Sequence, residues 1–182
     1  MPIAELSHAI QETDFFTALR ESALTYPIIM SLHLTSIAVF GGLILMTDLR
    51  LLGIAMRSTS ISDVVRQTRP WKWIGFVIMV TCGVLLACAK LDTYYGNPYF
   101  QIKLSLLVLV GVHALLFRRK VYANTAELDR APLIPGVAKT AACLSLVLWI
   151  GILSMGRWIA YYEPPGKFQR VTVPSSQIAP QK

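Results

Sequence analysis

The stretch from Ser22 to Thr47, SALTYPIIMSLHLTSIAVFGGLILMT, contains no aspartate, glutamate, lysine or arginine. A helix that crosses the apolar core of a membrane needs about 20 apolar residues, each adding about 1.5 Å of length. This stretch is long enough to cross with some tilt. It predicts the first span of an integral membrane protein.

Three further apolar runs follow, at about residues 73–89, 99–117 and 137–160. Lys103, Lys139 and Arg157 lie near the ends of these runs, where long basic side chains can reach the membrane interface. We therefore predict an all-α fold, an integral membrane four-helix bundle over residues 22–162. Of all residues, 54% are apolar, against about 45–50% in a typical soluble domain.

This distribution excludes a soluble enzyme, a disordered tail and a nucleic-acid-binding domain, although the net charge is +7. The three cysteines all lie inside apolar runs, so they predict small buried residues rather than a disulfide framework. Basic residues collect in the first and third loops, and basic loops mark the cytoplasmic side. We therefore expect both termini outside, with these loop residues in the cytoplasm: Arg50, Arg57, Arg66, Arg69, Lys72, Arg118, Arg119, Lys120 and Arg130.

The segments that flank the first span are also patterned. Apolar residues recur at helical spacing through residues 3–20, which predicts an amphipathic helix, within residues 1–21, on the outer membrane surface. A helix packed on the soluble side is the alternative. In the first loop, Ser60 can cap a short helix that Pro70 ends, and Asn97-Pro98 predicts a turn before the third span. Residues 163–182 have no apolar periodicity and predict an irregular tail.

Two histidines lie inside the spans, and an ionisable group in hydrocarbon is a functional candidate. Histidine ligates haem iron, so His33 is a candidate ligand for haem b and His113 is a weaker one. The alternative is a hydrogen bond from each histidine to a neighbouring helix. Counted from the outer edge, His33 lies roughly 10 Å deep and His113 roughly 15 Å deep, which disfavours one iron between them.

Arg157 lies among aromatic residues at the outer interface, where it could hold a haem propionate, a lipid phosphate or only headgroups. Asp48 ends the first span, and we expect it to be solvated. The sequence contains no nucleophile beside a base, no phosphate-binding glycine loop and no chain of acids in the membrane. It therefore predicts no catalyst that acts on its own.

Several stretches resemble the DUF6644 family of small bacterial four-span membrane proteins, for which no activity is established. The resemblance covers nearly all of residues 15–162, through Arg20-Glu21-Ser22, Tyr26-Pro27-Ile28-Ile29, His33, Thr47-Asp48-Leu49-Arg50-Leu51-Leu52-Gly53, Asn97-Pro98-Tyr99-Phe100-Gln101-Ile102-Lys103, Ser145-Leu146-Val147-Leu148-Trp149-Ile150 and Gly156-Arg157-Trp158-Ile159-Ala160-Tyr161. More distantly, His33 followed by Gly41-Gly42 resembles the CopD and cytochrome b561-like membrane proteins. That similarity implies haem or metal at His33.

Three hypotheses follow for a multi-pass protein of the bacterial inner membrane with a periplasmic tail. In the first, a haem b-binding subunit transfers electrons with a periplasmic redox protein or a quinone. In the second, a cofactor-free structural or assembly subunit works with other membrane subunits or as a homo-oligomer. The third is a metal or small-solute transporter, against which the absence of membrane carboxylates counts. The lipid bilayer is a partner in all three, and nucleic acid is a partner in none.

Overall fold

The computed structural model describes residues 3–117, 121, 123 and 125–163. Within these residues the chain is helical and contains no strand. The helices are α1 (Ile3–Gln11), α2 (Asp14–Glu21), α3 (Thr25–Leu51), α4 (Ile61–Ala89), α5 (Leu91–Tyr95), α6 (Pro98–Phe117), α7 (Thr125–Arg130) and α8 (Gly136–Ile159). The predicted tail, residues 163–182, lies outside the described residues after Glu163.

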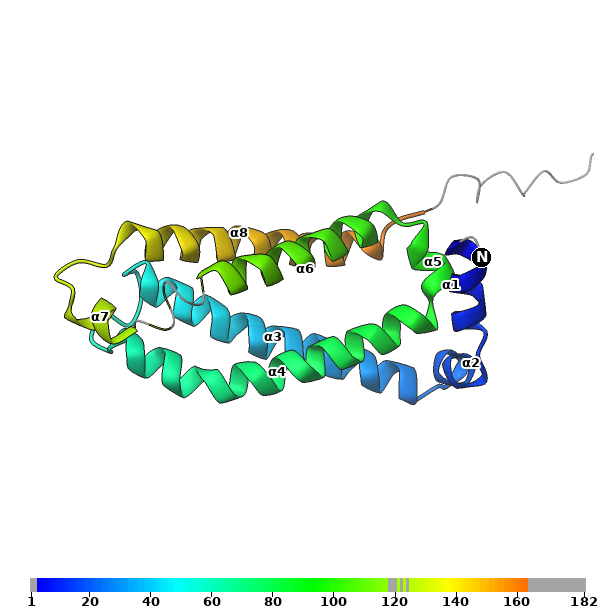
Figure 1. Ribbon diagram of the computed structural model, residues 1–182. Coiled ribbons are helices and arrows are strands. Elements are labelled where there is room, and N and C mark those ends of the chain that lie inside the picture. The colour runs from blue at the N-terminus through cyan, green and yellow to red at the C-terminus, as the bar shows by residue number, and fades with distance from the viewer. Residues whose placement is uncertain (1–2, 118–120, 122, 124, 164–182) are drawn as a thin grey trace, which may run out of the picture.

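Four of these helices, α3, α4, α6 and α8, run side by side as a bundle (Figure 1). Each is long and apolar enough to cross a membrane. Helix α3 packs along α4, α6 packs along α8, and contacts between α3 and α8 join the two pairs. Helices α1, α2 and α5 lie at one end of the bundle, called here the α5 end. Helix α7 and the loop of residues 52–60 lie at the other end, the α7 end.

The outer surface of the bundle is apolar. Helix α6 has no buried residue, and Leu115 on it is 70% exposed. Large apolar side chains on the outside of a long helix are stable when lipid covers them. The prediction of an all-α, multi-pass membrane bundle is therefore confirmed.

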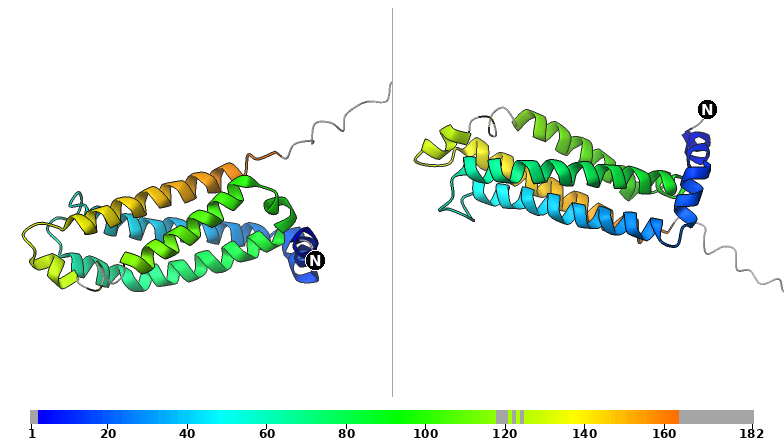
Figure 2. Two further views of the ribbon diagram at one scale, coloured as in Figure 1. Left: turned by 45° about the horizontal axis from the view of Figure 1, so that its top comes forward. Right: turned by 90° about the horizontal axis from the view of Figure 1, so that it is seen from below.

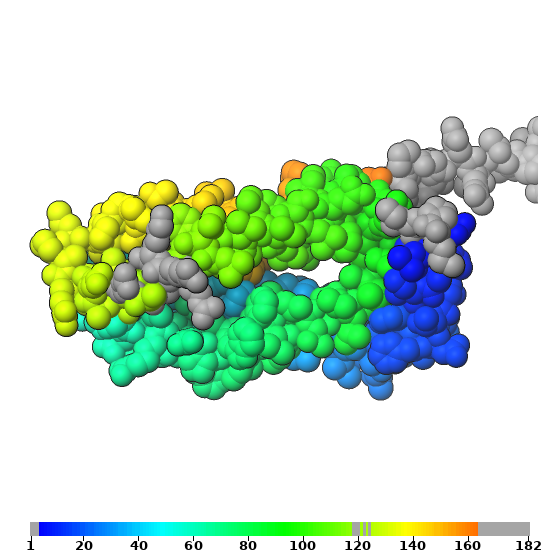
Figure 3. Space-filling view, viewed as in Figure 1, coloured from blue at the N-terminus to red at the C-terminus, as the bar shows by residue number. Residues whose placement is uncertain are grey.

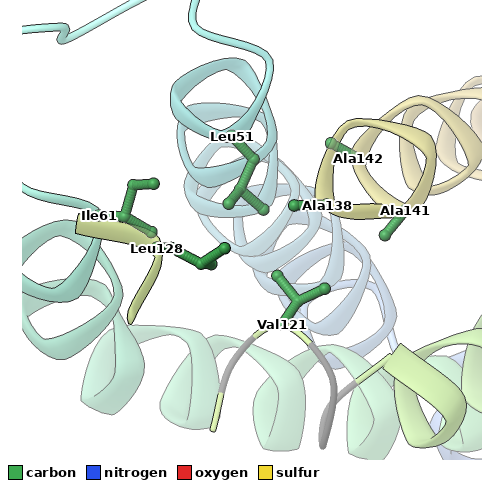
Figure 4. Close-up of a cluster of buried hydrophobic side chains, with 7 residues drawn as sticks. All are labelled: Leu51, Ile61, Val121, Leu128, Ala138, Ala141 and Ala142. Atoms are coloured by element: carbon green, nitrogen blue, oxygen red, sulfur yellow. The ribbon is translucent and has the colours of Figure 1, made fainter. Parts of the chain in front are cut away.

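A buried apolar cluster closes the α7 end (Figure 4). Small side chains on α8 let it approach α3 closely there, as is common between membrane helices. Val121, which lies between α6 and α7, packs into the same cluster. The cluster consists of Leu51, Ile61, Val121, Leu128, Ala138, Ala141 and Ala142.

Helix α4 differs from the prediction at Pro70. The Ser60 side chain caps the helix by accepting a hydrogen bond from the Asp63 amide at 3.1 Å, as expected. Pro70 does not end this helix, which continues through the second span to Ala89. Proline removes one backbone hydrogen bond, and neighbouring structure tolerates this in membrane helices. The short loop helix and the second span are therefore one element.

The N-terminal segment forms two helices where the sequence predicted one. Helix α1 ends at Gln11, and α2 begins at Asp14 after a turn in which Thr13 donates its hydroxyl to the Ile10 carbonyl at 2.9 Å. Both lie across the α5 end of the bundle (Figure 2). Ser7 of α1 donates to the Asp92 carboxylate of α5 at 2.9 Å, which fixes α1 there.

Asn97 forms the predicted turn before the third span. Its side-chain oxygen accepts the amide of Tyr99 at 3.0 Å, and Pro98 occupies the first helical position, where no amide is needed. Its side-chain amide donates to the Ile159 carbonyl of α8 at 3.3 Å. One buried residue thus starts α6 and joins it to the end of α8.

Candidate functional site

His33 lies on α3, about two helical turns from its start at Thr25. The Nδ1 atom is 2.9 Å from the Met79 carbonyl oxygen of α4. A carbonyl only accepts, so Nδ1 carries the proton and donates it. Within the described residues, Nε2 of His33 has no hydrogen-bond partner. A neutral imidazole fixed in this way offers the unprotonated Nε2 to a metal.

Gly83 on α4 provides the space for the His33 ring. A Cβ atom at residue 83 would lie 2.9 Å from Cε1 of His33, closer than real contacts allow. The structure uses Gly83 to admit a side chain, whereas a Cβ on Gly42 would meet nothing within 4 Å.

Lys103 of α6 is a charged group near His33 that belongs to the other helix pair. Its Nζ lies 3.7 Å from the position that a Cβ on Gly156 of α8 would take, so the side chain points toward α8. Lys103 has no hydrogen-bond or ion-pair partner in the part of the chain that the structure describes. An ammonium group in this position is available to an anionic group of a ligand.

The bundle is hollowed between α4 and α6. The space-filling view shows the opening in the half nearer to α1 (Figure 3). The two helices that border it belong to different pairs, and they are not among the element pairs with appreciable contact. The α5 half of the bundle therefore has room between its helix pairs that the α7 half lacks.

His113 lies elsewhere. Its Nε2 is 3.1 Å from the Ala141 carbonyl oxygen of α8, and its ring packs against Phe117 with centroids 4.8 Å apart. It lies about one turn before the end of α6, at the α7 end. The structure therefore holds His33 and His113 on different helix pairs and at different heights.

Arg157 lies on the exposed outer face of α8 rather than in the hollow. Its guanidinium lies over the Tyr161 ring, 4.8 Å from the centroid, and donates to the Tyr161 hydroxyl. Tyr99, Trp158 and Tyr162 pack edge to face nearby, as an interfacial aromatic belt does.

The sequence missed one polar residue. It predicted that Asp48 is solvated, and this prediction is wrong, because Asp48 is 0% exposed. Helix α3 continues past it to Leu51, and α4 and α8 enclose it. A carboxyl group therefore does lie inside the bundle, so the absence of membrane carboxylates that the sequence suggested does not hold. Only the packing of three helices buries Asp48, so a pattern along one helix does not reveal it.

An open pocket of about 360 Å³ lies at the α7 end, beside the start of α4. The Asp129 carboxylate crosses from α7 and accepts the amides of Ile61 at 2.6 Å and Ser62 at 3.2 Å. Burial alone raises the pKa of Asp129, but hydrogen bonds from Ser62 and Ile61, together with the charge of Arg50, outweigh it. The pKa of this carboxyl is therefore below its usual range.

No group of three or more histidine, cysteine, aspartate or glutamate side chains that could hold a bare metal ion occurs among the described residues. The cysteines are free, and Cys143 is exposed on the bundle rather than buried as predicted.

The fold and these sites define a four-span membrane helix bundle in which His33 joins α3 to α4 and His113 joins α6 to α8. The chain belongs to DUF6644, a family of unknown function whose model matches residues 12–162. This confirms the resemblance drawn from the sequence. No curated protein and no solved structure matches the chain significantly.

Proposed function

We propose that this protein is a subunit of the bacterial inner membrane that binds haem b through His33 and transfers electrons. The observation that carries the proposal is the fixed imidazole of His33. Its Nδ1–H is committed to the Met79 carbonyl, while Nε2 has no partner among the described residues. Proteins hold haem-ligating and metal-ligating histidines in this manner.

The surroundings of His33 fit a flat, anionic cofactor. Gly83 has no side chain, so it leaves space for the His33 ring. The hollow between α4 and α6 leaves space in the same half of the bundle for a cofactor (Figure 3). Lys103 supplies a positive charge on the inner side, which suits a propionate better than the outward-facing Arg157 does. Haem would supply a one-electron redox centre, and the protein residues would bind and orient it.

The positions of the two histidines agree better with one axial haem ligand from this chain than with two. His113 hydrogen-bonds a different helix at the α7 end, so we do not assign it to the same iron. A second ligand, if haem has one, comes from a partner such as another subunit or a second copy of the chain. A periplasmic redox protein or a membrane quinone would exchange the electron, so this subunit would not be a catalyst by itself.

We further propose that the α5 end faces the periplasm. The basic residues of the 52–60 loop and its neighbours lie at the α7 end, which the positive-inside rule places in the cytoplasm. Reporters test this orientation. A fusion after Lys182 should be active only in the periplasm, and an insertion at exposed Ser58 only in the cytoplasm. The opposite pattern would move His33 to the cytoplasmic half and remove the periplasmic partner.

Absorption spectroscopy tests the cofactor. Protein purified in mild detergent from haem-supplied cells should show a Soret band and a reduced-minus-oxidised alpha band. His33→Ala should lose both bands, whereas the matched variant His113→Ala should keep them. Colourless, iron-free wild-type protein would refute the electron-transfer function. Bands that persist in His33→Ala would show that another residue is the ligand.

A cofactor-free structural or assembly subunit is the second candidate. The specific observation in its favour is that both histidines already bond a backbone carbonyl of a neighbouring helix. Such bonds between membrane helices stabilise a bundle without any cofactor. Under this function, both histidine-to-alanine variants would lower the thermal stability of a protein that is colourless in every form.

A further inference from the structure

Asp48 is the most unusual polar residue in the bundle. It is 0% exposed, and neither of its carboxylate oxygens has a hydrogen-bond partner in the described part of the chain. Buried polar groups in native proteins are nearly always hydrogen-bonded, so an exception needs an explanation. An isolated carboxylate in an apolar interior is strongly unfavourable, and such a group takes up a proton instead.

The groups around Asp48 come from three helices. Thr47 precedes it on α3, Lys72 faces it from α4, and Ser145 faces it from α8. The Lys72 ammonium donates to the Thr47 hydroxyl, and no ion pair joins Lys72 to Asp48 among the described residues. Asp48 therefore lies near a positive charge without a direct contact.

The enclosure limits what can bind at this carboxyl. Thr47 is also fully enclosed, at 1% exposure, so no large ligand reaches the group without opening the bundle. The nearby charge of Lys72 disfavours a metal cation. A proton fits both limits, because it needs no cavity and removes the buried negative charge.

We propose that Asp48 is a proton-binding site, held as a neutral carboxylic acid in the resting bundle. A hydronium ion at the α7 end releases a proton, which forms an O–H bond with one carboxylate oxygen and leaves a water molecule, and no electron is transferred. The Ser145 hydroxyl is the nearby polar group, and it can donate a hydrogen bond to the carboxylate or accept one from the acid. The site lies one turn before the end of α3, so the α7 end is its shortest route to water.

This inference does not depend on haem, since it rests on burial and on missing partners. The alternative is an ion pair with Lys72 across an intervening water. The two arrangements predict opposite effects of removing the lysine. If Asp48 is neutral, Lys72→Met leaves it protonated. If Asp48 is ionised, Lys72→Met removes the compensating charge and forces protonation.

Infrared spectroscopy of the full-length protein in lipid nanodiscs at neutral pH distinguishes them. Wild type should show a protonated-carboxyl C=O band that shifts in D₂O and is lost in Asp48→Asn. Exposed Asp14→Asn serves as the matched control and should keep the band, as should Lys72→Met. Asp48→Glu retains a carboxyl group and should shift the band, which assigns it even if Asp48→Asn does not fold. A band that is absent from wild type, or that appears only in Lys72→Met, would overturn the proposal.

Discussion

The two ends of the bundle differ in how closely the helix pairs approach. At the α7 end, small residues of α8 such as Ala138 and Ala142 are buried against Leu51, and the interior is closed. Toward the α5 end, α8 has no buried residue after Ile152, and α4 and α6 diverge (Figure 3). The burial of α8 residues therefore distinguishes a closed half from an open half.

Each half holds a different kind of polar group. The closed half surrounds the buried Asp48, and the open half contains His33 and Lys103. We therefore expect the closed half to maintain the helix arrangement and the open half to accept a ligand. Substitutions that affect one half and spare the other test this division.

The largest effect is expected in the closed half. Leu51→Ala removes a side chain that is 1% exposed, and such cavities cost about 2–5 kcal/mol of unfolding free energy. The matched variant is Leu115→Ala, which lies on the lipid-facing surface of α6 and should change stability little. Thermal unfolding in detergent measures both. Equal losses of stability in the two variants would show that the α7 end is not the more tightly packed half.

A smaller effect is expected at Gly83 in the open half. Gly83→Ala places a Cβ at 2.9 Å from Cε1 of His33, and such overpacking typically costs about 1–3 kcal/mol. The ring must move and weaken its bond to Met79, so haem content should fall. Gly41→Ala on α3 is the control, because its Cβ meets nothing within 4 Å. If Gly83→Ala retains wild-type haem content and stability, then His33 is not held as described.

Asp129→Ala removes two hydrogen bonds from the start of α4 and should cost about 1 kcal/mol, as the loss of a helix cap does. The pKa of Asp129 is lowered in the folded protein, so its contribution is present above the unfolded pKa of about 4. That contribution disappears as pH falls through the folded pKa. Wild type and variant should therefore converge in stability in acid. Glu127→Ala on the same helix is the control, and a pH-independent difference would contradict the assignment.

The smallest effects, on haem binding and midpoint potential, are expected when two basic residues near the open half are replaced. Lys103→Met should weaken haem binding or shift its midpoint potential, because it removes the inward-facing charge. Arg157→Ala should leave both nearly unchanged, since its guanidinium lies over Tyr161 on the outer face. A redox titration of both variants measures the difference. The reverse order would assign the propionate to Arg157, as the sequence alone suggested.

The sequence was most informative where a property belongs to one helix. The lack of charge between Ser22 and Thr47 predicted a span, and Ser60 and Asn97 predicted helix starts, because capping is local. Pro70 was misjudged, because surrounding helices decide whether a proline ends a membrane helix.

The candidate site was only partly predictable, because most of its contacts depend on how neighbouring helices meet. His33 was recognised as a polar residue in hydrocarbon, but its bond to Met79 and the role of Gly83 depend on how α3 meets α4. The inward position of Lys103 depends on α8. The burial of Asp48 requires α3, α4 and α8 together, so its own helix gives no signal.

The central claim is that Nε2 of His33 binds haem iron in the open half. Chemical rescue tests it most directly, because it replaces only the missing imidazole. We predict that purified His33→Gly has no Soret band when prepared with haem, and that added free imidazole restores a wild-type-like spectrum at one haem per chain. Wild-type protein without haem, or a His33→Gly spectrum that matches wild type before imidazole is added, would contradict the account.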